Sequence, residues 1–312
     1  MDLIRETRFS NLGTLKTGKV RDIYFQADRL ILVATDRHSS FDRIIAHIPH
    51  KGAVLNLSSA YWFRQTADIV PNHVIAVPDP NVTVARRIKP LAVEAVVRGY
   101  LTGTTSTSIW TRYKNGERRF GDLVLPDGLK KNTKLPHPIF DPTTKEDTHD
   151  RALSLAELVS EGFIDAPTLE KLRVTALALF TRGQEVSARN GLLLVDTKYE
   201  FGLDEHGVLT LIDEIHTPDS SRYWMLASYQ ERLDRGEEPE YFDKEFLRLW
   251  FREHCDPYQD AVLPEAPAEM VAELSRRYIA IYRQLTGEKF AVDESEPPLQ
   301  RMERNLAPYR LG

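Results

Sequence analysis

The residues best placed to do chemistry lie in one stretch, residues 191–224, with the sequence GLLLVDTKYEFGLDEHGVLTLIDEIHTPDSSRYW. A short apolar run at residues 192–195 predicts a buried strand. Polar residues then alternate, so that Asp196, Lys198 and Glu200 share one face of the extended chain. Two carboxylates beside a lysine suggest a site that handles a cation and a charged substrate.

A second strand is predicted at residues 208–212, after a polar turn at residues 204–207. A hairpin that sets Lys198 opposite Asp213 places both residues on one face with Glu200, whereas a one-residue slip sends Asp213 to the other face. Carboxylates at the ends of buried strands are costly unless they are paired or hold a cation. The pattern therefore suits a magnesium–nucleotide site, although a surface hairpin with solvated charges fits it equally well.

The end of this stretch, residues 217–222, has the signature of a helix start. Thr217 is a typical N-cap and Pro218 a typical first helical residue. Free backbone N–H groups at such a start, together with Arg222, would suit a phosphate group.

A second group of polar residues follows a predicted buried strand at residues 90–97, which carries one carboxylate, Glu94. The strand delivers Arg98 to a loop rich in glycine and hydroxyl groups, residues 99–108. An arginine with several hydroxyls and backbone N–H groups binds a phosphate or carboxylate well, and a simple helix cap would need only one hydroxyl. This pattern favours ligand binding.

Near the N-terminus, residues 14–35 predict two strands and a turn, with Lys19 and Arg21 on alternating positions after a glycine. These two side chains could lie over a nucleotide phosphate, but the segment is not a Walker A motif and also fits a solvated basic edge strand. Residues 35–43 predict a polar loop directly after a buried strand, where α/β proteins often place ligand contacts.

The remaining elements provide the framework for these groups. An apolar helix is predicted at residues 53–69, and further helices at 151–162, 167–190 and 270–285. The last helical region has the pattern of packing rather than of chemistry. Residues 114–150 predict little regular structure, and their charged tail could close over a substrate. In that tail His149 and Asp150 suggest either metal ligation or, preferably, the start of a helix.

Composition excludes several classes of protein. With 312 residues the chain has the length of one large or two ordinary domains, and 42% hydrophobic and 28% charged residues are typical of globular proteins. A net charge of −5 argues against broad binding to nucleic acid or anionic membranes. The single cysteine, Cys255, fits a reducing compartment. Without an apolar leader or membrane span, we expect a cytoplasmic protein.

Seven segments together resemble the SAICAR synthetase family of purine biosynthesis. In chain order they are GKVRDIY (residues 18–24), TDRHSSFD (35–42), KGAVLN (51–56), VEAVVRGYLTGTTSTSIW (93–110), KLPHPIFDPTTKEDTHD (134–150), LLLVDTKYEFG (192–202) and DEIHTPDSSRYW (213–224). One segment alone has little specificity, but seven in the family's order are highly specific. Thr104 stands where the family pattern suggests Ser and keeps the hydroxyl, and His50 occupies a variable position.

The resemblance implies an α+β, ATP-grasp-like fold with two lobes. A smaller β-rich N-terminal lobe, residues 1–90, would cover the nucleotide, and a larger α/β lobe, residues 91–312, would hold metal and substrate contacts and the C-terminal helices. The implied enzyme is an ATP-dependent carbon–nitrogen ligase. It joins 5-amino-1-(5-phosphoribosyl)imidazole-4-carboxylate (CAIR) and L-aspartate to give SAICAR, ADP and phosphate through a carboxyl-phosphate intermediate.

The matching segments also imply roles for particular residues. Those for nucleotide binding are Lys19, Arg21, Glu94 and Lys198, and those for metal binding are Glu200 and Asp213. Those for CAIR are Asp36, Ser39, Arg98, Thr104, Ser106, Ser220 and Arg222. Lys198 and Asp219 would be catalytic. The implied cofactors are ATP and Mg²⁺, and the implied partners are small molecules, with the chain a monomer or a small homo-oligomer.

The residue types agree with this chemistry, because phosphorylation by ATP turns a carboxylate into a group that an amine can attack, and cations offset the gathered negative charge. No protein nucleophile is required. Two alternatives stay open, a small-molecule kinase with the same ATP site and a nucleotide-binding regulatory module without turnover.

Overall fold

The computed structural model describes residues 2–121, 123–145, 151, 153–242 and 245–311, which form two compact units. Unit 1 consists of Met1–Tyr61, His73–Arg87 and Phe242–Gly312, and unit 2 of Trp62–Asn72 and Ile88–Tyr241. The boundary near residue 87 lies close to the predicted lobe boundary at residue 90. However, the C-terminal helices belong by their contacts to the unit of the N-terminal strands, which the predicted division into 1–90 and 91–312 did not include.

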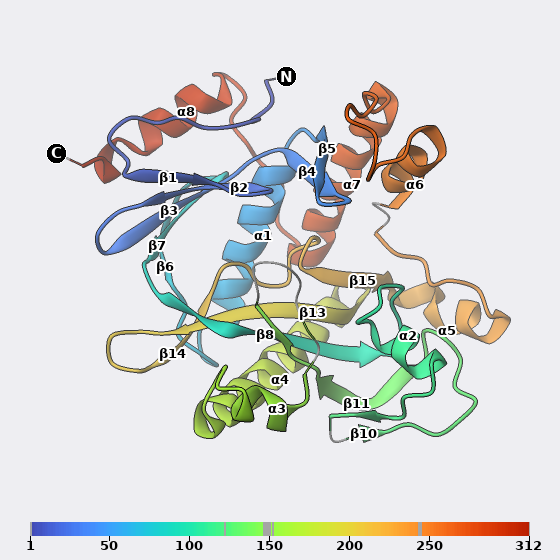
Figure 1. The fold of residues 1–312 in the computed structure, drawn as a ribbon. Coiled ribbons are helices and arrows are strands. Elements are labelled where there is room, and N and C mark those ends of the chain that lie inside the picture. The colour runs from blue at the N-terminus through green and yellow to red at the C-terminus, as the bar shows by residue number, and fades with distance from the viewer. Residues whose placement is uncertain (1, 122, 146–150, 152, 243–244, 312) are drawn as a thin grey trace. The chain divides into compact units, whose positions relative to one another are not determined.

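Unit 1 is built on a five-stranded antiparallel sheet in the order β1-β2-β3-β7-β6 (Figure 1). The strands are β1 (Thr14–Thr17), β2 (Arg21–Phe25), β3 (Arg29–Ala34), β6 (Val74–Asp79) and β7 (Val82–Arg86). The central strands β3 and β7 are apolar on both faces, which agrees with their buried side chains. The two strands and the turn predicted in residues 14–35 correspond to β2, β3 and the turn between them, whereas β1 is an additional strand that was not predicted.

The polar loop predicted at residues 35–43 is instead a hairpin of β4 (Arg37–Ser40) and β5 (Arg43–His47). Its two turn residues, Phe41 and Asp42, have φ of 56° and 58°, which matches the twist of a tight hairpin although neither residue is glycine. The Phe41 ring is held by an edge contact with Tyr258, at 5.4 Å between centroids. This non-local contact supports a turn that the local sequence does not favour.

The helices of unit 1 pack in two core clusters. They are α1 (Lys51–Gln65, of which residues up to Tyr61 belong to this unit), α6 (Glu245–His254), α7 (Ala268–Thr286), α8 (Pro298–Asn305) and the 3₁₀ turn η1 (Ala307–Tyr309). The apolar helix predicted at residues 53–69 and the helix predicted at 270–285 are confirmed. Leu274 and Tyr278 of α7 pack with Val54 of α1 in one core cluster, so the C-terminal helices do serve packing.

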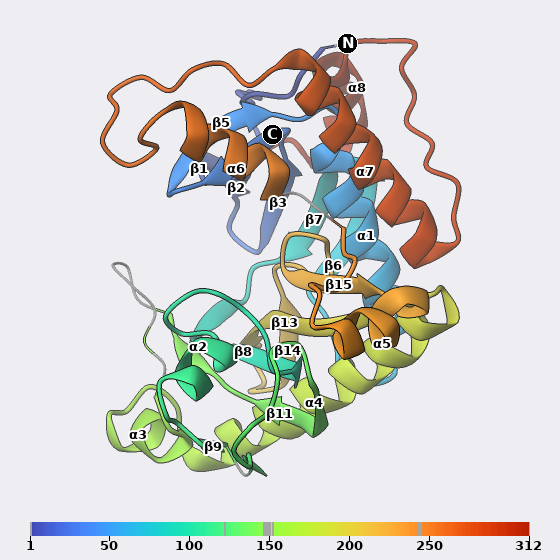
Figure 2. The ribbon, with the colours of Figure 1, turned by 90° about the vertical axis from the view of Figure 1, so that its right-hand side faces the viewer.

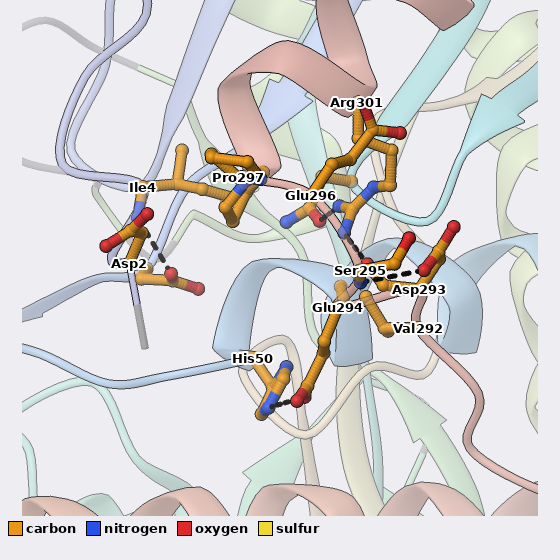
Figure 3. Close-up of a pocket in the computed structure, with 14 residues that line it drawn as sticks. Asp2, Ile4, His50, Val292, Asp293, Glu294, Ser295, Glu296, Pro297 and Arg301 are labelled. Carbon is orange, nitrogen blue, oxygen red and sulfur yellow. Dashed lines mark hydrogen bonds and ion pairs between the residues drawn. The ribbon is translucent and has the colours of Figure 1, made fainter.

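Helix α8 closes the other core of unit 1, where Met302 and Leu306 pack on the sheet. Beside them Arg301 forms a buried pair with Asp79, with Nε at 2.9 Å and Nη2 at 3.2 Å from its carboxylate oxygens. The segment that leads into α8 borders a cavity of about 490 Å³. Figure 3 shows Arg301 on one side of it and the ion pair of His50 with Glu294, at 3.2 Å, on another.

Unit 2 contains a six-stranded antiparallel sheet. Its main order is β11-β8-β13-β14, with β12 added to β8 and β15 added to β13. The strands are β8 (Lys89–Tyr100), β11 (Lys134–Phe140), β12 (Thr143–Thr144), β13 (Leu192–Leu203), β14 (Leu209–Ile212) and β15 (Ser221–Met225). A separate small ribbon pairs β9 (Arg119–Phe120) with β10 (Leu123–Val124).

The expectation of little regular structure at residues 114–150 is therefore wrong for β11 and β12. Backbone pairing with β8 turns Lys134–Phe140 into a strand although it contains two prolines, with a break in register between Lys134 and Ile139 that accommodates them. His149 and Asp150 lie outside the described residues.

One face of this sheet is covered by the long helix α4 (Ala166–Arg189), as Figures 1 and 2 show. Asp165 caps its N-terminus through a 2.9 Å bond from the amide of Thr168. Helix and sheet approach closely, since a Cβ on Gly183 would lie 2.6 Å from the side chain of Leu194. The other helices of unit 2 are α2 (Ile109–Lys114), α3 (Leu155–Ser160) and α5 (Leu226–Arg235). In the described parts of the chain, no helix combines the length and the apolar character that crossing a membrane requires.

Candidate active site

The face of the unit 2 sheet turned away from α4 carries the charged residues. Along β13, Thr197, Tyr199 and Phe201 are buried, whereas Lys198 and Glu200 between them are partly exposed. This is the alternation predicted from the sequence. A register shift between Leu194 and Asp196 lets the apolar residues on both sides of it face the helix.

Strand pairing brings charged residues of three strands into rows across this face, which we call the charged face. Asp196 of β13 is paired with Arg98 of β8 on one side and with Arg222 of β15 on the other. Four residues further along, Glu200 is paired with Glu94. The two rows are about 13 Å apart along the strands, given a rise of about 3.3 Å per residue. The charged face therefore has a carboxylate-rich end and an arginine-rich end.

Lys198 lies at the centre of the carboxylate-rich end. Its Nζ donates to Glu94 Oε1 at 2.7 Å and to Glu200 Oε1 at 3.2 Å. Burial works to lower the pKa of Lys198, but the charges of Glu200, Glu94 and then Asp213 outweigh it and raise the pKa above its ordinary value. Lys145 pairs with the other oxygen of Glu200. Lys198 thus stays a cation at neutral pH, held between carboxylates.

The predicted hairpin register is wrong by one residue, because Glu200 is paired with Ile212 and so Lys198 is not opposite Asp213. The turn contains one residue more than expected, since the amide and the side chain of Asp204 both bond to Val208. Asp213 still acts on Lys198, because it follows the end of β14 with φ of 66° and is released from strand alternation.

The helix predicted from Thr217 is also wrong. Residues 218–220 form a single turn in which Thr217 Oγ1 accepts from the amides of Asp219 and Ser220, at 3.3 and 3.1 Å. The chain then enters β15 at Ser221, because Tyr223 and Trp224 are buried and pair with β13. The cap chemistry of Thr217 is present, but strand pairing limits it to one turn, and helix α5 starts only at Leu226.

At the arginine-rich end, Arg222 Nη1 lies 3.6 Å from Asp196 Oδ2. Arg98 is nearly buried and donates from Nε to Asp141 at 2.7 Å. The hydroxyl-rich loop follows it, with Thr104 and Ser106 both exposed. Strand pairing thus brings Arg98 and Arg222 to one end of the face, with Arg98 held by a carboxylate that the sequence did not single out.

The predicted site residues of unit 1 lie in different surroundings. Lys19 is exposed and pairs with Asp42 at 2.7 Å, and Arg21 begins β2. Asp36 is buried, and its carboxylate accepts from the amides of Ile4 at 3.0 Å and Gly52 at 3.2 Å, the latter at the start of α1. Its carboxylate is thus used as a helix cap. Ser39 lies in β4, where it is partly exposed.

The cavity of unit 1 is a poor candidate for this chemistry, although Asp36 borders it. Its wall also carries the acidic side chains of Asp2, Asp293, Glu294 and Glu296. Such a wall repels phosphate-bearing substrates, so the charged face is the better candidate.

Three residues that pair with side chains of the charged face were not assigned a role from the sequence, namely Lys145, Asp141 and Asp196. Asp196 shares the alternation of Lys198 and Glu200, which is a signal that the sequence does contain. Lys145 and Asp141 come from a segment expected to be irregular, and only the pairing of β11 and β12 with β8 brings them to the sheet.

Beneath the charged face, Tyr199 and His216 are fully buried and their side chains meet at 2.5 Å. The ring of Trp62 packs edge-on against His216 at 4.6 Å. Burial alone lowers the pKa of His216 to about 3. His216 is therefore neutral at physiological pH, and it anchors the segment that leads to Thr217 and Ser220.

This burial predicts acid sensitivity. Because the pKa of His216 is about 3 in the folded state and ordinarily 6.5, the unfolded state binds the proton first as the pH falls. The contribution of neutral His216 to the free energy of unfolding is complete above pH 6.5. It declines by about 1.4 kcal/mol per pH unit as the pH falls from 6.5 towards about 3. In urea denaturation between about pH 6 and pH 4, His216→Gln should show a shallower loss of stability than the unchanged chain. Replacing the exposed His137 by Gln is the control, and equal slopes for His216→Gln and the unchanged chain would disprove the assignment.

Comparison with solved structures shows which class of protein has this fold. The SAICAR synthase of Saccharomyces cerevisiae, solved with SAICAR, matches with a TM-score of 0.79 and 31% identity over 92% of this chain and 99% of that one. A SAICAR synthetase solved in complex with ADP has the same fold, with a TM-score of 0.66 and 24% identity over 89% of this chain and 100% of that one. Together with the charged face, these likenesses define a ligase of purine biosynthesis.

Sequence comparison identifies the family. A model of the family described as SAICAR synthetase matches residues 14–265. The phosphoribosylaminoimidazole-succinocarboxamide synthase of Legionella pneumophila is 56% identical over 287 residues, 92% of each chain. The chloroplastic enzyme of the same name from Arabidopsis thaliana is 52% identical over 93% of this chain and 71% of its own length. The chain belongs to the SAICAR synthetase family.

Proposed function

We propose that this chain joins CAIR and L-aspartate to SAICAR at the charged face of unit 2, with conversion of ATP to ADP and phosphate. The observation that carries the proposal is the position of Lys198 between Glu94 and Glu200. Two residues away along β13, Asp196 lies in one row with Arg98 and Arg222. One end of the face offers a cation among carboxylates, and the other offers two arginines for a phosphate. CAIR carries both a phosphate and a carboxylate, and the spacing of the two ends suits a substrate with separate charged groups.

The carboxylate-rich end also fits Mg²⁺. Glu200 and Asp213 supply oxygen ligands, and with Glu94 they place three carboxylates beside the two ammonium groups of Lys198 and Lys145, so this end keeps an excess of negative charge. Among the described residues no group of three or more His, Cys, Asp or Glu could hold a metal. Mg²⁺ needs no such group, because it is commonly bound by one or two carboxylates with water and substrate phosphates. We propose Glu200 and Asp213 as its ligands, where it would neutralise phosphate charge.

In the proposed reaction the CAIR carboxylate takes up the γ-phosphoryl group of ATP and becomes an acyl phosphate. The amine of L-aspartate then attacks the acyl carbon, the C–O bond to phosphate breaks, and an amide and phosphate form. Lys198 is proposed to stabilise the charge that develops on the transferring group, since its ammonium is fixed before the reaction. On the turn of Thr217, Asp219 is proposed as a catalytic residue between nucleotide and CAIR, and Ser220 as a contact to CAIR.

An ATP-grasp-like arrangement, in which the two units have different roles, is part of the same proposal. We assign nucleotide covering to unit 1, with Lys19 and Arg21 near the ATP phosphates, and metal and substrate contacts to unit 2, with Glu94 on the nucleotide side. Asp36, Ser39, Thr104 and Ser106 stay predictions as substrate contacts. So do a cytoplasmic location and a monomer or small oligomer.

The test is ADP release measured with CAIR alone, with L-aspartate alone and with both. The proposal expects sustained ADP release and SAICAR formation only with both substrates. A small-molecule kinase would release ADP at the same rate with CAIR alone, and a regulatory module would release none with any combination. Either of these results would overturn the proposal.

A further inference from the structure

Arg98 is the end of a series of four alternating charges that runs through unit 2, Glu117–Arg112–Asp141–Arg98, which we call the arginine relay. Its members come from α2, the turn that follows it, the end of β11 and strand β8. None of the first three lies in a row of the charged face. The relay therefore connects residues outside the proposed site with a residue inside it.

Asp141 is the centre of the relay. One oxygen accepts from Arg98 Nε at 2.7 Å, and Arg112 Nη1 lies 2.8 and 3.0 Å from the two oxygens. The side chains of Asp141 and Arg98 are each 10% exposed. A single carboxylate is thus shared by two arginines in nearly buried surroundings, so its position is fixed from two sides.

Arg112 is fixed from its other side. Its Nε and Nη2 form a fork on Glu117, at 2.9 and 2.5 Å, and its guanidinium lies 5.0 Å from the centre of the Phe120 ring. A planar guanidinium that is bonded on two edges cannot rotate away from Asp141. Arg112 therefore holds Asp141 in place rather than competing with Arg98 for it.

The relay determines which edge of Arg98 remains for a ligand. Nε is used by Asp141, and Nη2 makes a long contact of 3.4 Å with the carbonyl of Thr107 in the hydroxyl-rich loop. Nη1 has no hydrogen bond to any residue that the structure describes. Buried ion pairs contribute little net stability, because desolvation offsets their attraction, so orientation is the more economical explanation of the relay.

We infer that Asp141 and Arg112 are positioning residues that orient Arg98 for the phosphate of CAIR. This inference rests on the proposed function, because it assumes that Arg98 binds that phosphate. It predicts that loss of either residue weakens CAIR use through Arg98, while the nucleotide end of the charged face and the chemical step are spared.

Steady-state kinetics with Asp141→Asn, Arg98→Ala and the double variant tests this inference. Asp141→Asn should raise KM for CAIR about tenfold, as loss of an outer-shell partner typically does, with kcat and KM for ATP little changed. Arg98→Ala should raise KM for CAIR by about one to two orders of magnitude, the cost of losing a charge-assisted hydrogen bond. When Arg98 is already replaced by Ala, adding Asp141→Asn should raise KM for CAIR by less than about twofold more, because Asp141 acts through Arg98.

Arg112→Lys is a second variant in case Asp141→Asn fails to fold, and it should also raise KM for CAIR selectively. The matched control is Asp127→Asn, which breaks the exposed pair of Asp127 with Arg118, 2.7 Å long, in the same part of unit 2. Its KM values should match those of the unchanged chain.

Four results would overturn the inference. A full additional loss in the double variant, or an equal rise in both KM values, would mean that Asp141 only supports the fold. Unchanged KM for CAIR in Asp141→Asn and Arg112→Lys, with a clear rise in Arg98→Ala, would refute positioning and leave the proposed function intact. Normal KM for CAIR in Arg98→Ala would refute the role of Arg98 itself, whereas the proposed function fails only if SAICAR does not form.

Discussion

Replacing Lys198 by methionine is expected to lower kcat/KM for SAICAR formation by about 100- to 1,000-fold, the typical cost of one preorganised electrostatic group. Lys198 is the central cation of the carboxylate-rich end and has two carboxylate partners, Glu94 and Glu200. Its removal leaves these carboxylates facing the negative charge of ATP and CAIR without compensation. The long side chain of methionine preserves most of the packing of the lysine stem.

The matched control is Lys89→Met, which removes an exposed lysine from β8 of the same sheet. It should leave kcat/KM nearly unchanged. Glu200→Gln is the companion variant and should lose most activity at limiting Mg²⁺ and regain part of it at high Mg²⁺, since it removes one proposed ligand. If Lys198→Met and Lys89→Met have the same activity, the charged face is not the active site.

Breaking the buried pair of Arg301 and Asp79 should have the largest effect on stability. Arg301→Met is expected to lower the free energy of unfolding by about 3–5 kcal/mol, because it leaves a buried carboxylate without its partner. Asp79, the last residue of β6, has a fully buried side chain. Arg301 of α8 pairs with it and also donates to Asn81 in the turn before β7, and Asn305 of the same helix donates a further hydrogen bond to Asp79. Urea denaturation followed by circular dichroism measures the change.

The control is Arg310→Met, which breaks an exposed pair with Glu303 in the same C-terminal segment, 2.7 Å long. Exposed pairs contribute about 0–1 kcal/mol, so this variant should be nearly as stable as the unchanged chain. Adding Asp79→Asn to Arg301→Met should restore part of the lost stability, because it removes the unpaired charge. Equal stability of Arg301→Met and Arg310→Met would show that the C-terminal helix does not depend on the pair.

The sequence allowed prediction of those features that depend on local pattern. The alternation of Asp196, Lys198 and Glu200 identified the face of β13 correctly, because a strand buried on one side must alternate. The strand before Arg98 was predicted from its apolar run, and the long helix before residue 191 from apolar residues at helical spacing. Family resemblance then connected these local features with a reaction.

The predictions that were wrong concern features that depend on contacts between distant residues, which the local sequence pattern does not contain. The hairpin register changed because the side chain of Asp204 enlarges the turn by one residue, and the helix at Thr217 was replaced by a strand because β13 was available for pairing. The positions of Asp141 and Lys145 depend on β11 and β12 joining β8. The pair of Arg301 with Asp79 joins residues 222 positions apart, which explains why the C-terminal helices were not expected beside the N-terminal strands.

The central claim is that the CAIR carboxylate is activated by direct transfer of a phosphoryl group, without a covalent intermediate on the protein. CAIR labelled with ¹⁸O in its carboxylate tests this most directly, because one carboxylate oxygen must leave with phosphate when the amine attacks. Mass spectrometry of the products should find one labelled oxygen in the inorganic phosphate for each SAICAR formed. Inorganic phosphate free of label, with SAICAR still formed, would contradict activation of this carboxylate by ATP.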